Sequence, residues 1–274
     1  MAKFEGILIC TDLDGTLIGS DHRISKKNLD AIEYFKNEGG LFTIVTGRVP
    51  VTAKALYEEV RPNVPICCLN GGAIFDHLKG EYVWLSTLCD KALDVIDFVA
   101  EKMPDIGIQI NTANNIYFSR NNESTEYFRV RTGVPNLEKH YRSVNEPISK
   151  VLLSSMSNES ILALAELLKE HPSYADFDFI RSEATLYEIL PKGNSKGNVM
   201  KRLVEYLGLD MNKTIAIGDY DNDVSMLRAA KLGVAVANAS DAAKKAADRI
   251  TVSNDEHAIA RVIYDLERGE IAFR

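Results

Sequence analysis

Four groups of polar residues in this sequence have side chains that could do chemistry. Each group follows an apolar run or begins a helix, and the residues are Asp12 and Asp14, Thr46 and Arg48, Lys196, and Asp219 and Asp223. Carboxylates that converge in one place repel one another, and some take up protons unless a cation is present. Mg²⁺ would resolve this conflict, since it takes oxygen ligands, keeps several waters and binds substrate phosphates.

Two of the other polar side chains favour an anion as the ligand. Lys196 at a helix N-terminus and the Thr46 hydroxyl are both hydrogen-bond donors that suit phosphate oxygens. Carboxylates, a hard cation, a lysine and a threonine together indicate phosphoryl transfer to a carboxylate nucleophile. The sequence has no G-x-x-x-x-G-K-[ST] motif, so we do not expect a P-loop to hold the phosphate.

Alternating strands and helices must position these residues. Apolar runs at residues 6–11, 41–45 and 214–218 predict strands buried on both faces, and Ser25 can cap a helix between the first two. Its apolar face is expected to be Leu29, Ile32 and Phe35. A strand–helix–strand unit has parallel strands, whose carboxyl ends share the sheet edge where ligands bind. All the acidic groups would meet there if strands 6–11 and 214–218 are neighbours.

The sequence pattern changes in the middle of the chain. From about Ser86 to Leu190, alternating and amphipathic segments predict a half-exposed antiparallel sheet with helices on one face. From Lys196 the first pattern returns, with Ser195 as the cap of a helix. We therefore predict a doubly wound, Rossmann-like, mostly parallel α/β core at residues 1–85 and 190–274, interrupted by an α+β module at 86–189.

Composition excludes several classes of function. The 274 residues include 32 Lys and Arg against 39 Asp and Glu, a net charge of −7, which argues against nucleic acid as a partner. No apolar stretch approaches the roughly 18 residues of a membrane span. The N-terminus is too short and too charged for a signal peptide, and the four cysteines lack C-x-x-C spacing. We expect a cytoplasmic protein, and the oligomeric state stays open.

Taken in their order along the chain, the four polar groups resemble the motifs of the haloacid dehalogenase superfamily of phosphatases. The match to D-x-D-G-T is complete from Asp12 to Thr16. The long insert resembles a type IIB cap, and Asn70-Gly71-Gly72 and the segment from Tyr187 to Gly197 are similar to segments of Cof-type members. The resemblance covers essentially the whole chain. It implies that the core is catalytic and that the cap determines substrate specificity.

The resemblance also implies a role for each matching residue. Asp12 would attack phosphorus and form an aspartyl-phosphate, and Asp14 would protonate the leaving alcohol and then activate water. The implied Mg²⁺ ligands and their support are Asp12, Asp14 through its backbone carbonyl, Asp219 and Asp223. The implied phosphate-binding residues are Leu13, Thr46, Gly47, Lys196 and Asn222. Arg48 stays open between anchoring a phosphate and pairing with a local acid.

We favour a Mg²⁺-dependent phosphatase for small phosphomonoesters, with sugar phosphates ahead of pyridoxal phosphate and nucleotides. Related P-type pumps carry Thr at the second acid, so Asp14 as a built-in general base favours hydrolysis. One alternative is a phosphomutase like the phosphomannomutases, which would return the phosphoryl group to a sugar and release no phosphate. The other is a non-catalytic sugar-phosphate sensor, which would have no need of an acid–base pair.

Overall fold

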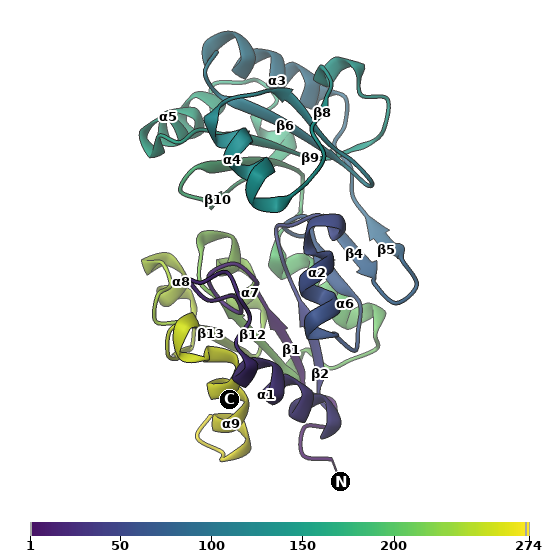
Figure 1. Ribbon diagram of the computed structural model, residues 1–274, viewed down its shortest axis with the longest axis vertical. Coiled ribbons are helices and arrows are strands. Elements are labelled where there is room, and N and C mark those ends of the chain that lie inside the picture. The colour runs from purple at the N-terminus through teal and green to yellow at the C-terminus, as the bar shows by residue number, and fades with distance from the viewer. Residues whose placement is uncertain (1, 272, 274) are drawn as a thin grey trace. The chain divides into compact units, whose positions relative to one another are not determined.

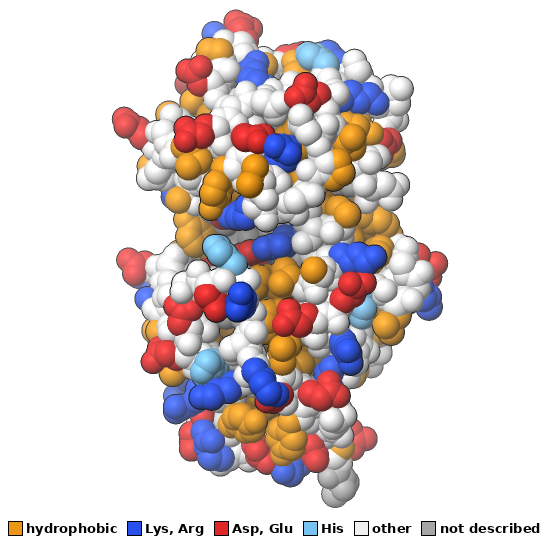
Figure 2. Space-filling view, viewed as in Figure 1, with side chains coloured by type: hydrophobic (Ala, Val, Ile, Leu, Met, Phe, Trp, Pro, Cys, Tyr) orange, Lys and Arg blue, Asp and Glu red, His pale blue; other side chains and the backbone are white. Residues whose placement is uncertain are grey.

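The computed structural model describes residues 2–271 and 273. Within this part the chain divides into two compact units. One runs up to Trp84 and resumes at Ser195, and the other is Leu85–Asn194. We call the first the core unit and the second the insert unit. None of the helices in the described part of the chain has the length and hydropathy that a bilayer crossing requires. On the face shown in Figure 2, acidic and basic side chains are interspersed over the surface.

A five-stranded parallel sheet with the order β14-β13-β12-β1-β2 forms the centre of the core unit. Its strands are β1 (Leu8–Thr11), β2 (Leu41–Ile44), β12 (Thr214–Gly218), β13 (Leu232–Ala235) and β14 (Arg249–Ile250). Thr11 at the end of β1 lies in register with Ile44 on one side and Ile217 on the other. The predicted adjacency of the first strand and the strand at 214–218 is therefore confirmed.

The chain winds in both directions from the middle of this sheet, from β1 to β2 and from β12 through β13 to β14. Right-handed crossovers then place α1 (Lys26–Asn37) and α7 (Val224–Ala229) on opposite faces. Helix α9 (Ala258–Glu267) packs against α1, and α6 (Lys196–Tyr206) packs against α7 (Figure 1). This doubly wound arrangement confirms the predicted fold class.

A further part of the core unit lies beyond β2. A parallel bridge from Val45 to Cys67 leads to a small second sheet with the order β3-β4-β5. The other elements are α2 (Pro50–Val60), β3 (Ile66–Cys68), β4 (Ala73–Asp76), β5 (Glu81–Leu85) and α8 (Asp241–Ala246), which packs against α7 and β13. The turn between β3 and β4 therefore follows a strand that neighbours β2, and it comes close to the residues after β2.

Capping serines begin the two core helices for which the sequence predicted a cap. Ser25 and Ser195 accept the backbone N–H groups of Asn28 and Asn198. The predicted apolar face of α1 is wrong in one position, because Leu29 is only half-buried and Asn28 is buried instead. The Oδ1 atom of this buried amide accepts the backbone N–H of Ala260 in α9, whereas its Nδ2 has no partner among the described residues.

The insert unit contains a six-stranded sheet with the order β10-β11-β9-β6-β7-β8. Its strands are β6 (Gly107–Thr112), β7 (Ile116–Arg120), β8 (Leu137–Glu138), β9 (Ile148–Ser154), β10 (Phe177–Glu183) and β11 (Leu186–Pro191). The pairing is antiparallel except between β7 and β8. Helices α3 (Lys91–Lys102) and α5 (Asn158–Leu168) contribute to its apolar core with one face of the sheet, and α4 (Glu123–Thr132) follows β7.

The prediction of a half-exposed sheet is wrong for the central strands β6, β9 and β11, which are buried along nearly their whole length. Ile108 and Ile110 of β6 belong to the apolar core, while Gln109 and Asn111 point to the opposite face. There, Gln109 donates to Asn111 over 2.8 Å, and Lys150 pairs with Glu188 over 2.8 Å. Alternation of polar and apolar residues did not indicate exposure here, because polar partners within the sheet permit burial.

Candidate functional site

Asp12 and Lys196 form a buried ion pair at the carboxyl ends of β1 and β12. Asp12 follows β1 directly, and its backbone N–H donates to the carbonyl of Ile217. Lys196 is the first residue of α6, and its side chain is 1% exposed. Its Nζ donates to Oδ1 of Asp12 and to Oδ1 of Asp223, each over 2.6 Å. The structure thus brings together three predicted site residues from three segments of the chain.

Asp223 organises the loop after β12. Its Oδ2 accepts the backbone N–H groups of Asp219 and Tyr220 over 2.9 Å and 3.1 Å. Asp219 is held from the other side by Thr16 of the D-x-D-G-T motif, whose hydroxyl donates to Oδ1 of Asp219 over 2.6 Å. Both oxygens of Asp223 therefore position neighbours. Among the described residues, Oδ2 of Asp219 accepts no hydrogen bond and could bind another ligand.

The buried carboxylates of Asp12, Asp219 and Asp223 have oxygens that all lie within 4.8 Å of one another. Burial and the neighbouring carboxylates raise the pKa of Asp12 well above its usual range, and Lys196 opposes them. Burial, followed by the charge of Asp223, raises the pKa of Asp219 to about 7. Burial alone would lower the pKa of Lys196, but Asp12 and Asp223 outweigh it and raise that pKa. Without a metal ion, the positive charge of Lys196 is therefore too small to keep all three carboxylates ionised.

A divalent cation fits this donor set. Three ionised carboxylates and one ammonium carry a net charge of −3 + 1 = −2, which a divalent ion would neutralise. The available ligand atoms are carboxylate oxygens, which hard cations such as Mg²⁺ prefer. The side chain of Asp14 does not belong to this cluster. Asp14 would therefore have to bind a metal through its backbone carbonyl, as the family resemblance implied.

Asp14 pairs instead with Arg48. Nε and Nη2 of Arg48 donate to the two oxygens of Asp14 over 2.8 Å and 2.6 Å. Of the two roles left open for Arg48, the structure shows pairing with a local acid. The side chain of Asp14 is 45% exposed, whereas that of Asp12 is 8% exposed. The two acids of the motif therefore lie in different surroundings.

The predicted phosphate-binding residues come from the same edge of the sheet. Leu13 and Thr46 follow the ends of the neighbouring strands β1 and β2, and both residues are buried. Asn222 is also buried, and its Nδ2 donates to Oδ1 of Asn70 over 3.0 Å. No role was predicted for Asn70, although the similarity of Asn70-Gly71-Gly72 to a segment of Cof-type members pointed to this turn.

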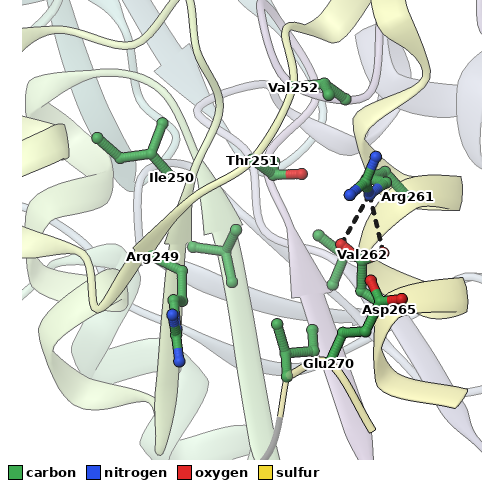
Figure 3. Close-up of a pocket in the computed structure, with 10 residues that line it drawn as sticks. Arg249, Ile250, Thr251, Val252, Arg261, Val262, Asp265 and Glu270 are labelled. Carbon is green, nitrogen blue, oxygen red and sulfur yellow. Dashed lines mark hydrogen bonds and ion pairs between the residues drawn. The ribbon is translucent and has the colours of Figure 1, made fainter. Parts of the chain in front are cut away.

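The cavity drawn in Figure 3 is separate from these residues. It has a volume of about 360 Å³ and lies between β14 and α9. Arg261 on its wall donates through Nε to both oxygens of Asp265. None of the predicted site residues lines this cavity, so it is not the candidate site.

Comparison with known proteins identifies the family. Residues 9–263 match the family model of haloacid dehalogenase-like hydrolases. The chain belongs to this family. It is 30% identical over 292 residues to a 5-amino-6-(5-phospho-D-ribitylamino)uracil phosphatase of Bacillus subtilis, with 96% of this chain and 99% of the relative covered.

Solved haloacid dehalogenase-like structures share the fold. A hydrolase of the family from Bacteroides thetaiotaomicron is 27% identical, with a TM-score of 0.83 over 96% of this chain and 100% of that chain. A sugar phosphatase of subclass IIB is 23% identical, with a TM-score of 0.84 over 97% of this chain and 100% of that chain. The predicted family and its activity class are confirmed: the protein is a haloacid dehalogenase-like hydrolase of the phosphatase type.

Proposed function

We propose that this phosphatase hydrolyses small phosphomonoesters, sugar phosphates first among them, with Mg²⁺ and through an aspartyl-phosphate on Asp12. The observation that carries the proposal is the different placement of the two acids. Asp12 is buried against Lys196 within the carboxylate cluster, whereas Asp14 lies outside the cluster. This division suits a nucleophile that needs positioning and a second acid that exchanges protons with water and substrate.

The binding roles follow from the donors at this edge of the sheet. Asp12 and Asp219, the Asp14 backbone carbonyl and, in support, Asp223 would hold Mg²⁺. When bound, the ion would neutralise the carboxylates and stabilise charge on the phosphoryl oxygens. The residues proposed to bind those oxygens are Leu13, Thr46, Gly47, Lys196 and Asn222. Lys196 would at the same time hold the carboxylate of Asp12 in place.

The proposed reaction has two steps on the chain's own carboxylates. In the first, a carboxylate oxygen of Asp12 attacks phosphorus, the bond from phosphorus to the ester oxygen breaks, and Asp14 gives its proton to the leaving oxygen. In the second, ionised Asp14 takes a proton from water while that water attacks the aspartyl-phosphate. Asp12 is regenerated and inorganic phosphate is released.

We further propose that the core unit does the chemistry and that the insert unit, as a type IIB cap, selects the leaving group. Every candidate catalytic residue belongs to the core unit. The insert sheet carries a buried polar set opposite its apolar core, namely Gln109, Asn111, Lys150 and Glu188. Such groups suit hydroxyl-rich ligands. The names of the Bacillus subtilis relative and of the subclass IIB sugar phosphatase also support a sugar-like substrate.

Phosphate release from a panel of sugar phosphates, with and without Mg²⁺, tests this function. We expect release from at least one sugar phosphate, loss of activity on chelation, and recovery with Mg²⁺. Asp12→Asn should lower turnover by several orders of magnitude, while Asp30→Asn on the exposed side of α1 should not. Isomerised sugar phosphate without phosphate release would indicate a phosphomutase, and binding without turnover would indicate a sensor. Either result would overturn the proposal.

A further inference from the structure

The turn between β3 and β4 has an unusual backbone. Leu69 and Asn70, neither of them glycine, have φ values of 59° and 52°, and Gly71 follows with φ of 100°. This left-handed conformation costs free energy for residues with a Cβ atom and persists where surrounding contacts hold it. Leu69 and Asn70 are both fully buried, so the conformation is not that of a loose surface turn.

Contacts connect this turn to the loop that carries Thr46 and Gly47. The backbone N–H of Leu69 donates to the carbonyl of Arg48 over 3.0 Å, and that of Asn70 donates to the carbonyl of Thr46 over 3.1 Å. The Asn70 amide lies directly against Gly47, where an added Cβ atom would fall 2.9 Å from its nitrogen and its oxygen. The loop after β2 is therefore shaped around the side chain of Asn70.

The same turn contacts two further segments to which phosphate binding is proposed. Oδ1 of Asn70 accepts a hydrogen bond from Nδ2 of Asn222, a residue 152 positions later in the chain. Gly71 lies so close to Ser195 that an added Cβ atom would fall 2.2 Å from the Ser195 carbonyl oxygen. Ser195 caps α6, in which Lys196 is the first residue. One turn thus touches the segments that carry Gly47, Asn222 and Lys196.

We propose that Asn70 is a positioning residue, which sets the placement of Asn222 and of the Thr46–Gly47 loop for binding the phosphoryl group. The proposal rests on the proposed phosphatase function, because phosphate is the ligand that these groups would hold. Nδ2 of Asn70 is buried and has no partner among the described residues. A buried donor without a partner is costly, which is consistent with selection of this side chain for placement rather than for stability.

The direct test removes the amide without disturbing the backbone. Asn70→Gly loses the side chain but accepts positive φ readily, and Arg61→Gly is the matched control, since Arg61 also has φ of 52° and is exposed at the end of α2. We expect Asn70→Gly to lower both kcat/KM and the affinity for inorganic phosphate with Mg²⁺ by about tenfold to a hundredfold, with cooperative unfolding retained. Arg61→Gly should change each by less than about twofold.

A double-mutant cycle with Asn222→Ala separates positioning from a general loss of structure. If Asn70 acts through Asn222, the two losses in phosphate affinity combine to less than their product. Fully multiplicative losses, or phosphate affinity of Asn70→Gly within twofold of wild type, would overturn the proposal. Should Asn70→Gly not fold, Asn70→Ala takes its place in the cycle with Asn222→Ala, because it removes the same amide, and phosphate affinity within twofold of wild type would again overturn the proposal.

The two proposals fail in different ways. A wild-type protein that neither hydrolyses phosphate esters nor binds inorganic phosphate overturns the proposed function, and the role of Asn70 with it. An active wild type beside an unaffected Asn70→Gly overturns the role of Asn70 alone.

Discussion

Arg48 holds Asp14 through two hydrogen bonds, from Nε over 2.8 Å and from Nη2 over 2.6 Å, although the residues are 34 positions apart. Paired donors of this kind favour the ionised carboxylate and fix its orientation. Asp14 is the residue proposed to give a proton to the leaving group, and Arg48 fixes the orientation of the carboxyl that would carry it. Arg48 is therefore part of the arrangement that governs proton transfer.

Asp14→Asn should discriminate between leaving groups. The variant keeps the nucleophile Asp12 but has neither a proton donor nor a base, so we expect turnover of an alkyl phosphate to fall by about 10² to 10⁴. p-Nitrophenyl phosphate needs less protonation of its leaving group and should lose less. The measurement is kcat on both substrates, with Asp30→Asn as the surface control. Equal losses on the two substrates would contradict the acid role.

Arg48→Ala should discriminate between the two leaving groups in the same direction as Asp14→Asn, but more weakly. Loss of the two hydrogen bonds leaves Asp14 present but poorly oriented, so we expect about a tenfold loss on an alkyl phosphate and a smaller loss on p-nitrophenyl phosphate. A phosphate-anchoring Arg48 would instead raise KM for both substrates alike. Comparison of kcat and KM for the two esters therefore separates orientation of Asp14 from anchoring of a phosphate.

Asp219 makes the stability of the metal-free protein depend on pH. Its pKa is about 7 in the folded protein, because it is buried beside Asp223, against 3.8 for an ordinary aspartate. Between these values the folded protein keeps a proton that the unfolded chain has released. Below pH 3.8 the contribution of this proton to the free energy of unfolding is fully present. It is lost as pH rises toward about 7, by at most about 1.4 kcal/mol per pH unit.

Mg²⁺ should reverse this trend, because binding the ion requires the proton to leave. We expect Mg²⁺ to raise the thermal unfolding temperature more at about pH 8 than at about pH 5. Asp219→Asn should lose most of the metal stabilisation and of the pH dependence attributed to this carboxylate. The measurement is the thermal unfolding temperature of the wild type and of Asp219→Asn, each with Mg²⁺ and with a chelator. Equal stabilisation by Mg²⁺ at the two pH values would argue against Asp219 as a ligand.

Gln109→Leu should change substrate choice rather than chemistry. The Oε1 atom of Gln109 is buried without a partner among the described residues, on the polar face of the insert sheet. We expect preference among sugar phosphates to shift by about 10- to 100-fold and hydrolysis of p-nitrophenyl phosphate to change far less. Glu159→Gln, on the exposed first turn of α5, is the control. Parallel losses on all substrates would show that the insert unit takes part in catalysis.

Local features of the sequence were enough to predict the elements that carry the site. A strand buried on both faces needs an uninterrupted apolar run, so the strands that precede Asp12 and Asp219 were visible without the structure. Ser195 and the apolar spacing after it likewise predicted the helix that Lys196 begins. The parallel sheet edge then followed, because a strand–helix–strand unit brings the carboxyl ends of its strands together.

Only the tertiary structure decided which polar groups are partners. Arg48 with Asp14, and Asn70 with Asn222, join segments 34 and 152 residues apart. Such pairs depend on strand order and loop conformation, which hydrophobic periodicity does not encode. The burial of Gln109 was hidden for a related reason, since alternation shows which residues share a face of a sheet but not what covers that face. The sequence thus determined where the chemical groups stand along the chain, and long-range packing determined which of them meet.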